Sequence, residues 1–221
     1  MHGKLIVIEG LDGSGKATQV SILEKRLNES GKNIRKVDFP CYQEDSSALV
    51  RMYLNGDFGT DPNAVNSYAA SSFYAVDRFA SFARDWKTDY ENGFTILADR
   101  YTTSNAVFQM NKLPEDEWIS YLDWLRDFEY DKMKIPKPNI VIYLDVPVNV
   151  SQKLISGRYK GDESKKDIHE RDIAFLKRSR ESALFAAKID GWHIIDCSDN
   201  GEIRDIKDIS AEIFEKVMRF A

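Results

Sequence analysis

The chain of 221 residues has few of the side chains that build disulfide frameworks or histidine-rich metal centres, with two cysteines and three histidines. Cys41 and Cys197 lack the spacing of metal ligands, so we expect two free thiols. Apolar runs are also short, and none approaches the ~18 residues of a membrane-spanning helix. These absences argue against a disulfide-stabilised, metal-clustered or membrane-embedded protein.

An excess of positive charge is absent too. Asp and Glu number 36 against 31 Lys and Arg, a net charge of −5. A nucleic-acid-binding protein ordinarily carries a basic surface, so we expect no nucleic-acid partner. Residues 1–4 lead directly into an apolar run without a signal peptide, which predicts a cytoplasmic protein with no membrane partner.

The most informative segment present is the glycine-rich run 10–16, which reads GLDGSGK between a predicted strand and a predicted helix. Glycines let backbone N–H groups turn inward around phosphate oxygens, and a helix N-terminus adds positive potential. A tight turn with a solvated lysine would not need three glycines. We therefore predict a P-loop that binds ATP through Gly10, Leu11, Asp12, Gly13, Ser14, Gly15, Lys16, Ala17 and Thr18.

One position departs from the usual P-loop. The template places Ser or Thr directly after the lysine to reach Mg²⁺, whereas here Ala17 comes first and Thr18 follows. The displaced hydroxyl argues against a Ras-like GTPase. It is compatible with nucleoside monophosphate kinases, in which the metal is held more through water.

Five short apolar segments alternate with helical patterns along the chain, as in a parallel sheet buried on both faces. They predict an α/β fold, a three-layer P-loop NTPase sandwich with a five-stranded parallel sheet flanked by helices, in one domain over residues 1–221. The strands are predicted at 5–9, 34–39, 94–98, 140–145 and 193–196. The helices are predicted at 16–30, 62–91, 103–110, 115–130, 168–188 and 203–220.

The segment 156–171 differs from the rest, because it is polar and holds two glycines and five Lys or Arg residues. It reads either as a solvated loop or as a mobile lid that closes over phosphates. Basic residues near a phosphate-binding sheet edge favour the lid. Arg100 follows the third strand, at the edge where parallel sheets bind ligands, and could grip phosphate oxygens or pair with Asp99.

Five segments, in order, resemble the thymidylate kinase family and span most of the chain. They are residues 10–19 (GLDGSGKATQ), 39–40 (FP), 74–78 (YAVDR), 99–105 (DRYTTSN) and 136–145 (PKPNIVIYLD). The resemblance implies an ATP- and Mg²⁺-dependent dTMP kinase that makes dTDP in dTTP biosynthesis, usually as a homodimer. The implied catalytic residues are Asp12, Lys16, Arg100 and Arg158.

The resemblance also implies a dTMP site. Tyr74 would stack on thymine, and Arg78, one helical turn on, would donate to a base carbonyl. A core aromatic and a solvated charge are the alternatives for these two positions. Asp12 would bind the sugar 3′-hydroxyl and lie near the metal, or cap the helix. The implied dTMP-binding residues are Asp12, Phe39, Arg51, Tyr74, Arg78, Arg100, Ser104, Asn105, Phe108 and Gln109.

Two features set this chain apart within the resemblance. Position 13 is glycine, where some members carry an arginine, so the lid should supply the catalytic cation. Arg158 is the first choice, and Lys160, Lys165 and Lys166 are the substitutes. Cys41 follows Phe39-Pro40, where an arginine is common, and Arg51 could replace it. The metal ligands implied are Asp12, Thr18 and Glu170, largely through water.

Three other functions remain open. A deoxynucleoside kinase shares the P-loop but needs a carboxylate base for its sugar hydroxyl. An adenylate-kinase-like enzyme would accept AMP. A GTPase switch would read guanine with Asn-Lys-Xaa-Asp, but residues 111–114 read NKLP, with Pro114 in place of the aspartate.

Overall fold

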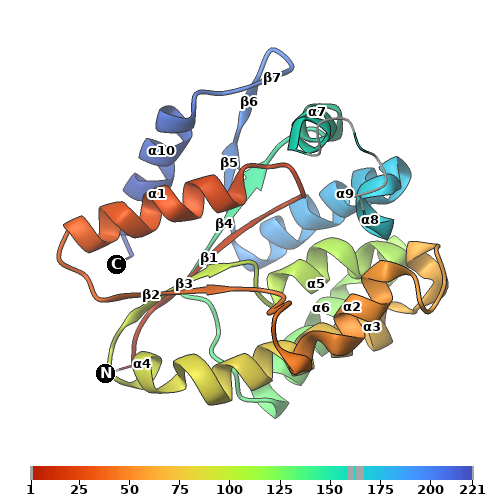
Figure 1. Cartoon of the computed structure of the whole chain (residues 1–221), viewed down its shortest axis with the longest axis horizontal. Coiled ribbons are helices and arrows are strands. Elements are labelled where there is room, and N and C mark those ends of the chain that lie inside the picture. The colour runs from red at the N-terminus through yellow and green to blue at the C-terminus, as the bar shows by residue number, and fades with distance from the viewer. Residues whose placement is uncertain (1, 159–161, 163–166, 221) are drawn as a thin grey trace.

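The computed structural model describes residues 2–158, 162 and 167–220. Its centre is a parallel sheet in the order β2-β3-β1-β4-β5 (Figure 1). The strands are β1 (Leu5–Gly10), β2 (Ile34–Asp38), β3 (Thr95–Asp99), β4 (Ile140–Asp145) and β5 (His193–Asp196). Each predicted strand is confirmed to within one residue at either end. Strands β1 and β4 are buried along their whole length, which explains why their sequences lack an apolar-polar alternation.

Helices cover both faces of the sheet. The α-helices are α1 (Lys16–Glu29), α2 (Ala48–Asn55), α3 (Ser67–Ser81), α4 (Lys87–Glu91), α5 (Thr103–Phe108), α6 (Trp118–Arg126), α7 (Val148–Arg158), α8 (Ile168–Arg171), α9 (Ile173–Asp190) and α10 (Ile206–Met218). Short 3₁₀ turns are η1 (Asp45–Ser47), η2 (Pro62–Ala64), η4 (Met110–Lys112) and η5 (Glu115–Glu117), and π-helical turns are η3 (Phe82–Trp86) and η6 (Asp127–Lys132).

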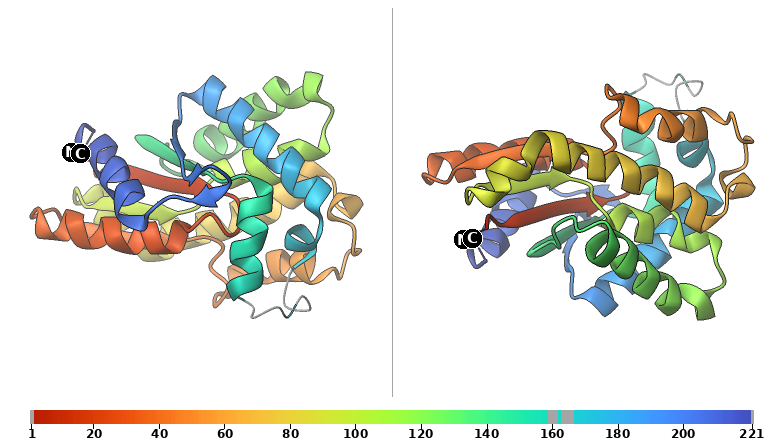
Figure 2. Two further views of the ribbon diagram at one scale, coloured as in Figure 1. Left: turned by 90° about the horizontal axis from the view of Figure 1, so that it is seen from above. Right: turned by 90° about the horizontal axis from the view of Figure 1, so that it is seen from below.

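Alternate residues of β1 face two separate cores, which makes the three predicted layers. Ile6 and Ile8 pack with apolar side chains of α1 and α10 on one face. Leu5 and Val7 pack with the α5, α6 and α9 side of the molecule on the other. The two views of Figure 2 show α1 and α10 in front of the sheet from above, and α3 and α6 in front from below.

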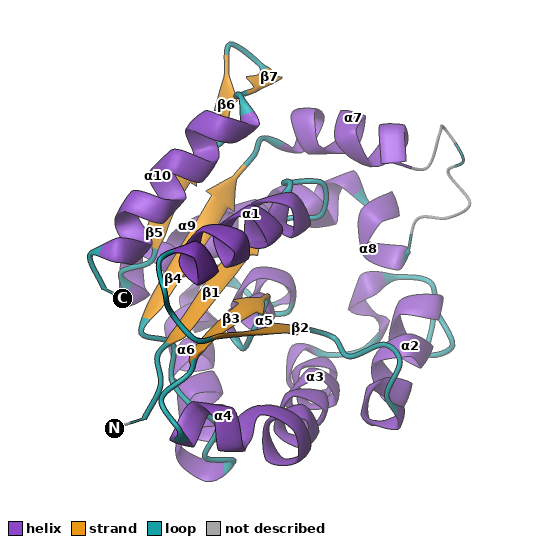
Figure 3. Ribbon diagram, turned by 60° about the vertical axis from the view of Figure 1, so that its left-hand side comes forward, coloured by secondary structure: helices purple, strands orange, loops and turns teal. Residues whose placement is uncertain are grey.

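Beyond the carboxyl ends of the strands lie α2, α7 and α8 (Figure 3). A small third cluster, formed by Tyr53, Ala70 and Ile168, joins α2, α3 and α8 at this end. Helix α7 was not predicted from the sequence, and neither was the hairpin of β6 (Ser198–Asp199) and β7 (Glu202–Ile203). No helix in the described part of the chain has the length and apolar character of a membrane span.

The predicted helix 16–30 agrees with α1 to within one residue, whereas the other predicted helices are shortened or divided. The predicted helix 62–91 begins only at Ser67, where the Asn66 side chain accepts a hydrogen bond from the Ala69 N–H, and it contains the π-helical turn η3. The predicted helix 168–188 breaks at Asp172, whose backbone is extended. Similarly, 103–110 and 115–130 divide into α-helical, 3₁₀ and π-helical pieces, and 203–220 starts only at Ile206, after the Asp205 cap.

Asp172 separates α8 from α9 and caps the longer helix. Its carboxylate accepts a hydrogen bond from the Phe175 N–H at 2.9 Å. We expect Asp172→Ala to lower the free energy of unfolding by about 1 kcal/mol, since a first-turn N–H loses its partner. Asp172→Asn, which keeps the acceptor, is the control and should stay near the wild-type value. Urea denaturation measures both, and equal losses in the two variants would contradict the cap.

Candidate active site

The P-loop joins β1 to α1 and packs closely against α7 at Gly13. Gly13 and Gly15 have φ values of 75° and 82°, which other residues rarely adopt. A Cβ atom on Gly13 would lie 2.5 Å from the Ser151 carbonyl oxygen and 2.8 Å from Cγ1 of Ile155. Helix α7 therefore leaves no space for a side chain at position 13, which is the physical reason why this loop carries no arginine there.

Lys16 is the cation of the loop, and it is buried. Its Nζ donates to the carbonyl oxygens of Gly10 and Leu11 at 3.0 and 2.8 Å. Burial, together with the charge of Arg100, lowers the pKa of Lys16 to about 8, although Asp12 opposes this shift. A negatively charged group in the loop would favour the protonated amine.

Arg100 lies where the two halves of the site meet. It follows β3 with φ at 66°, an unusual value for a side-chain-bearing residue. Its Nη2 donates to Asp12 Oδ1 at 2.6 Å and its Nη1 to Glu9 Oε1 at 3.1 Å, and the guanidinium lies 4.8 Å from the centre of the Phe108 ring. These carboxylates raise the pKa of Arg100 despite its burial.

Glu9 is a site residue that the sequence interpretation missed. Its carboxylate is fully buried and accepts from the Gly10 N–H, the Thr103 hydroxyl and the Ser104 hydroxyl, at 2.7 to 2.9 Å, as well as from Arg100. A glutamate that ends an otherwise apolar strand was the available signal. Glu9 thus ties the start of the P-loop to α5 and to Arg100.

Asp12 extends from the P-loop toward Arg100. Burial alone would raise the pKa of its carboxyl, but the charges of Arg100 and Lys16 hold it below the ordinary value. The carboxylate is therefore ionised at neutral pH. Its side chain keeps 27% exposure, which leaves it accessible from the cleft.

Two adjoining cavities open from this centre. The first, the P-loop cavity, is lined by residues 12–18, by residues at the ends of β2 and β3 and just after them, and by Asp167 and Glu170 at the start of α8. The second, the base cavity, lies between α2, α3, α5 and α8 and is lined by Asp12, Phe39, Pro40, Tyr42, Leu54, Tyr74, Arg78, Arg100, Tyr101, Ser104, Asn105, Phe108, Gln109, Asp167 and His169. Asp12, Phe39 and Arg100 line both.

The base cavity contains nearly all the residues predicted to bind dTMP. Tyr74 packs edge-on against Tyr53, with ring centres 6.5 Å apart. Arg78 is only 1% exposed, so it is not a solvated helix charge. Gln109 is 1% exposed and its amide lines the same cavity.

Arg51 is the predicted dTMP-binding residue that does not line this cavity. Its Nη1 donates to the carbonyl oxygens of Tyr42 and Glu44 and to the Ser47 hydroxyl, at 2.6 to 2.8 Å. It therefore fixes the segment after β2, which includes Tyr42, a residue that lines both cavities. Whether Arg51 also contacts a phosphate stays a prediction.

Of the predicted lid, residues 156–158, 162 and 167–171 lie in the described part. Arg158 is the last residue of α7, and the structure describes its backbone but not its side chain. Lys160, Lys165 and Lys166 lie outside the described residues. At the other end, Asp167 and Glu170 form a capping box at the start of α8 and line the P-loop cavity.

The side chains at the start of α8 have unusual pKa values. Burial, with the negative charge of Asp12, raises the pKa of Asp167 to about 7. Burial also lowers the pKa of His169 to about 3. His169 was not among the predicted site residues. Its ring stacks on Phe108 and Phe175, and its Nε2 lies 2.9 Å from the Tyr53 hydroxyl.

The oxygen donors around the P-loop fit a magnesium ion bound with a polyphosphate. Asp12, Thr18 and Glu170 line the same cavity, and no three Asp, Glu, His or Cys side chains within residues 2–158, 162 and 167–220 form a metal cage. Mg²⁺ ordinarily keeps several waters and takes one or two carboxylates plus substrate phosphates. The donor set matches that pattern rather than a preformed protein cage.

The geometry does not support guanine recognition by residues 111–114. Asn111 is buried and donates to the Ser179 hydroxyl at 2.6 Å. Lys112 donates to the Tyr53 hydroxyl and to the Val65 carbonyl oxygen. These side chains have structural partners, and neither lines the two cavities.

A P-loop beside a polar, aromatic cavity at the carboxyl edge of a five-stranded parallel sheet defines a P-loop nucleotide-binding protein. A solved thymidylate kinase from Candida albicans has the same fold, with a TM-score of 0.70 and 21% identity over 99% of this chain and 92% of that one. The family model described as thymidylate kinase matches residues 8–208. The chain therefore belongs to the thymidylate kinase family.

Individual relatives agree with this assignment. A thymidylate kinase from a Sulfurihydrogenibium species is 31% identical over 84% of each chain. A probable thymidylate kinase from Pyrobaculum aerophilum is 26% identical over 97% of this chain and 98% of its own. The Mycobacterium tuberculosis thymidylate kinase is 28% identical over 85% of this chain and 87% of its own.

The buried imidazole of His169 makes the stability of the fold sensitive to acid. Because its pKa is depressed in the folded state, the unfolded chain binds the extra proton between about pH 6.5 and pH 3, and stability is lost as the pH falls through this window. We expect His169→Phe, which keeps an aromatic ring between Phe108 and Phe175, to reduce this loss. Thermal unfolding at pH 7.5, 5.5 and 4.5 measures the effect, and parallel pH profiles for the two proteins would contradict it.

Proposed function

We propose that the protein transfers the γ-phosphoryl group of ATP to dTMP, giving ADP and dTDP. The observation that carries the proposal is Arg100, which lines both the P-loop cavity and the base cavity. A triphosphate in one cavity and a nucleoside monophosphate in the other would place their phosphates at this arginine. The membership of the chain in the thymidylate kinase family supports thymine as the base.

The chemistry needs alignment more than proton transfer. The second pKa of a phosphate monoester is about 6, so the acceptor is mostly dianionic at neutral pH and needs no general base. Lys16 and the loop amides hold the β- and γ-phosphates of ATP, and Arg100 holds the acceptor phosphate in line. Asp12, Thr18 and Glu170 would hold Mg²⁺ largely through water, and the bound ion would neutralise charge on the phosphates.

The residues that line the base cavity recognise the base. Tyr74 supplies a face on which thymine stacks, and Phe39 and Phe108 complete the apolar surface. Arg78 donates to a carbonyl of the base, and Asn105 reads the adjacent position with its amide. Ser104 and the buried amide of Gln109 supply further polar contacts, and Asp12 accepts from the sugar hydroxyl.

A cation from the segment 156–171 completes the site when that segment closes over the phosphates. Arg158 is the first candidate, with Lys160, Lys165 and Lys166 as substitutes. The packing of α7 on Gly13 supports this division of labour, since it prevents the P-loop from carrying an arginine of its own. Closure would also exclude water, which otherwise competes for the phosphoryl group.

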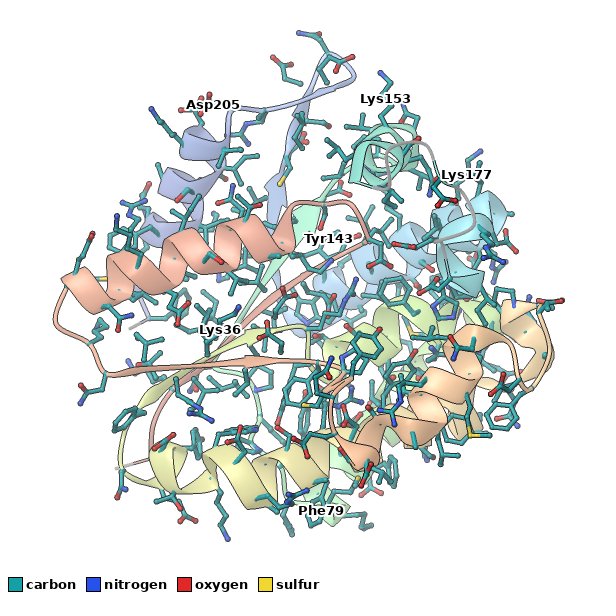
Figure 4. All side chains as sticks on the ribbon, viewed as in Figure 1. Lys36, Phe79, Tyr143, Lys153, Lys177 and Asp205 are labelled. Carbon is teal, nitrogen blue, oxygen red and sulfur yellow. The ribbon has the colours of Figure 1, made fainter. Side chains whose placement is uncertain are left out.

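We also propose a cytoplasmic homodimer that forms through α3. Val76 and Phe79 on this helix are 49% and 44% exposed, and Figure 4 shows Phe79 on the side of α3 that faces away from the sheet. Apolar side chains exposed together on one helix favour burial against a second copy. Sedimentation equilibrium tests the assembly, and a monomer at micromolar concentration would contradict it.

The direct test of the proposed function is an ATP-consumption assay over nucleosides and nucleoside monophosphates. We expect turnover with dTMP, and little with thymidine or AMP. Phosphorylation of thymidine in preference to dTMP would instead identify a deoxynucleoside kinase. Preference for AMP would identify an adenylate-kinase-like enzyme.

Lys16 is the residue on which ATP binding and phosphoryl transfer depend most. We expect Lys16→Ala to abolish measurable turnover of dTMP, because no other side chain in residues 10–18 carries positive charge. Lys25→Ala on the exposed face of α1 is the control and should keep wild-type rates. Steady-state kinetics compare the two, and undiminished turnover in Lys16→Ala would refute the assigned role.

A further inference from the structure

A second buried carboxylate lies behind the base cavity without lining it. Glu129, in the π-helical turn η6, is fully buried. It accepts three hydrogen bonds from two residues that do line the cavity. Arg78 donates its Nε and Nη2 at 2.7 and 2.6 Å, and Asn105 donates its Nδ2 at 3.0 Å. Glu129 therefore contacts both residues assigned to read the base, from the side away from it.

The carboxylate fixes the orientation of the Asn105 amide. An ionised carboxylate only accepts hydrogen bonds, so it must face the NH₂ group of Asn105 and not the carbonyl oxygen. The same Nδ2 also donates to the Ser71 carbonyl oxygen at 3.3 Å. Both N–H groups are thereby used, while Oδ1 accepts no hydrogen bond from the described residues and remains available on a side chain that lines the cavity. Asn105 thus offers the cavity an acceptor.

The same carboxylate also orients Arg78, which offers the cavity a hydrogen-bond donor. Two of its three nitrogens are held by Glu129, and the third, Nη1, donates to the Tyr101 carbonyl oxygen at 3.3 Å. Since Nη1 carries two N–H groups, one is left to donate elsewhere. The base cavity therefore presents a donor from Arg78 beside an acceptor from Asn105.

We propose that Glu129 is a positioning residue that sets the base specificity of the site. This inference rests on the proposed function, in which Arg78 and Asn105 meet the edge of the base. Thymine and uracil present a carbonyl oxygen beside an N–H, which complements the donor and acceptor. Cytosine presents an amino group beside an unprotonated nitrogen, so both of its contacts would be mismatched, and such unpaired polar groups give strong rejection.

The burial of this pair supports orientation as its role. Arg78 and Glu129 have side-chain exposures of 2% and 0%. Desolvation offsets most of the attraction in such a pair, and apolar residues of similar volume often stabilise a fold as well or better. Apolar residues at these two positions could not orient a donor and an acceptor toward the cavity, whereas the Arg78–Glu129 pair does.

The test is Glu129→Gln, measured as kcat/KM for dTMP, dUMP and dCMP with saturating ATP. A glutamine has one acceptor oxygen in place of two, so it cannot accept all three hydrogen bonds, and the Arg78 guanidinium or the Asn105 amide loses a partner that fixes its orientation. Loss of one oriented hydrogen bond, ~1–3 kcal/mol, corresponds to a fall of about 5- to 150-fold for dTMP. We expect dUMP to fall by the same factor, so that the dTMP/dUMP ratio is unchanged.

The decisive readout is the dTMP/dCMP ratio, which we expect to fall at least about tenfold, while KM for ATP stays unchanged. Glu117→Gln, the same change at an exposed position, is the control and should leave every ratio at the wild-type value. A reduced rate with an unchanged dTMP/dCMP ratio would overturn the inference, since a merely structural role would lower all three substrates together. Failure of the wild-type enzyme to use dTMP would instead refute the proposed function.

If Glu129→Gln does not fold, the wild-type protein decides the question by NMR. We expect the side-chain NH₂ of Asn105 to exchange slowly with solvent in the absence of nucleotide, because both N–H groups are bonded inward. The protection should persist when dTMP is added. Rapid exchange in the free protein, or loss of protection on binding dTMP, would show that the amide does not present its oxygen to the base and would overturn the inference.

Discussion

The ion pair between the buried carboxylate of Glu9 and Arg100 is the contact on which the site depends. Glu9 belongs to the central strand of the sheet, and its position is therefore set by the core. Its partner Arg100 has a backbone φ of 66°, a conformation that costs of order 1–3 kcal/mol for a residue with a Cβ atom. The surrounding structure sustains this strain at the point where the P-loop cavity and the base cavity meet. Among the described residues, both arginines that line the cavities pair with a buried glutamate, Arg100 with Glu9 and Arg78 with Glu129.

The described side chains around the P-loop carry more negative than positive charge, so binding of a polyphosphate there needs further cations. Among the described residues, the P-loop cavity is lined by Asp12, Asp38, Asp99, Asp167 and Glu170, against the cations Lys16 and Arg100. Such a surface would repel an unaccompanied polyphosphate, and it suits a polyphosphate bound together with a divalent cation. Helix α7 closes the space beside Gly13. The proposed source of added positive charge is therefore outside the loop, in the segment 156–171, which holds five Lys or Arg residues.

Strands and the P-loop could be predicted from the sequence because their signals are local, within a few neighbouring residues. Buried parallel strands such as Ile140–Asp145 are apolar throughout, and the P-loop has a fixed length and composition, so both were predicted closely. Helix boundaries were less accurate, because a single capping side chain such as Asn66 or Asp172 outweighs the apolar periodicity around it. The partners of Glu9 and Glu129 could not be predicted, since they lie far away along the chain, although Glu9 itself was marked by its place at the end of an apolar strand. Arg78 and Glu129 are 51 positions apart, and Glu9 and Arg100 are 91 apart.

The central claim is that one cleft holds both nucleotides at once and that the phosphoryl group passes directly between them. Initial rates measured over a grid of ATP and dTMP concentrations test this claim most directly. Direct transfer within a ternary complex predicts reciprocal plots that intersect, with each substrate saturable at every fixed level of the other. Parallel plots, which indicate that ADP leaves before dTMP binds, would contradict the account.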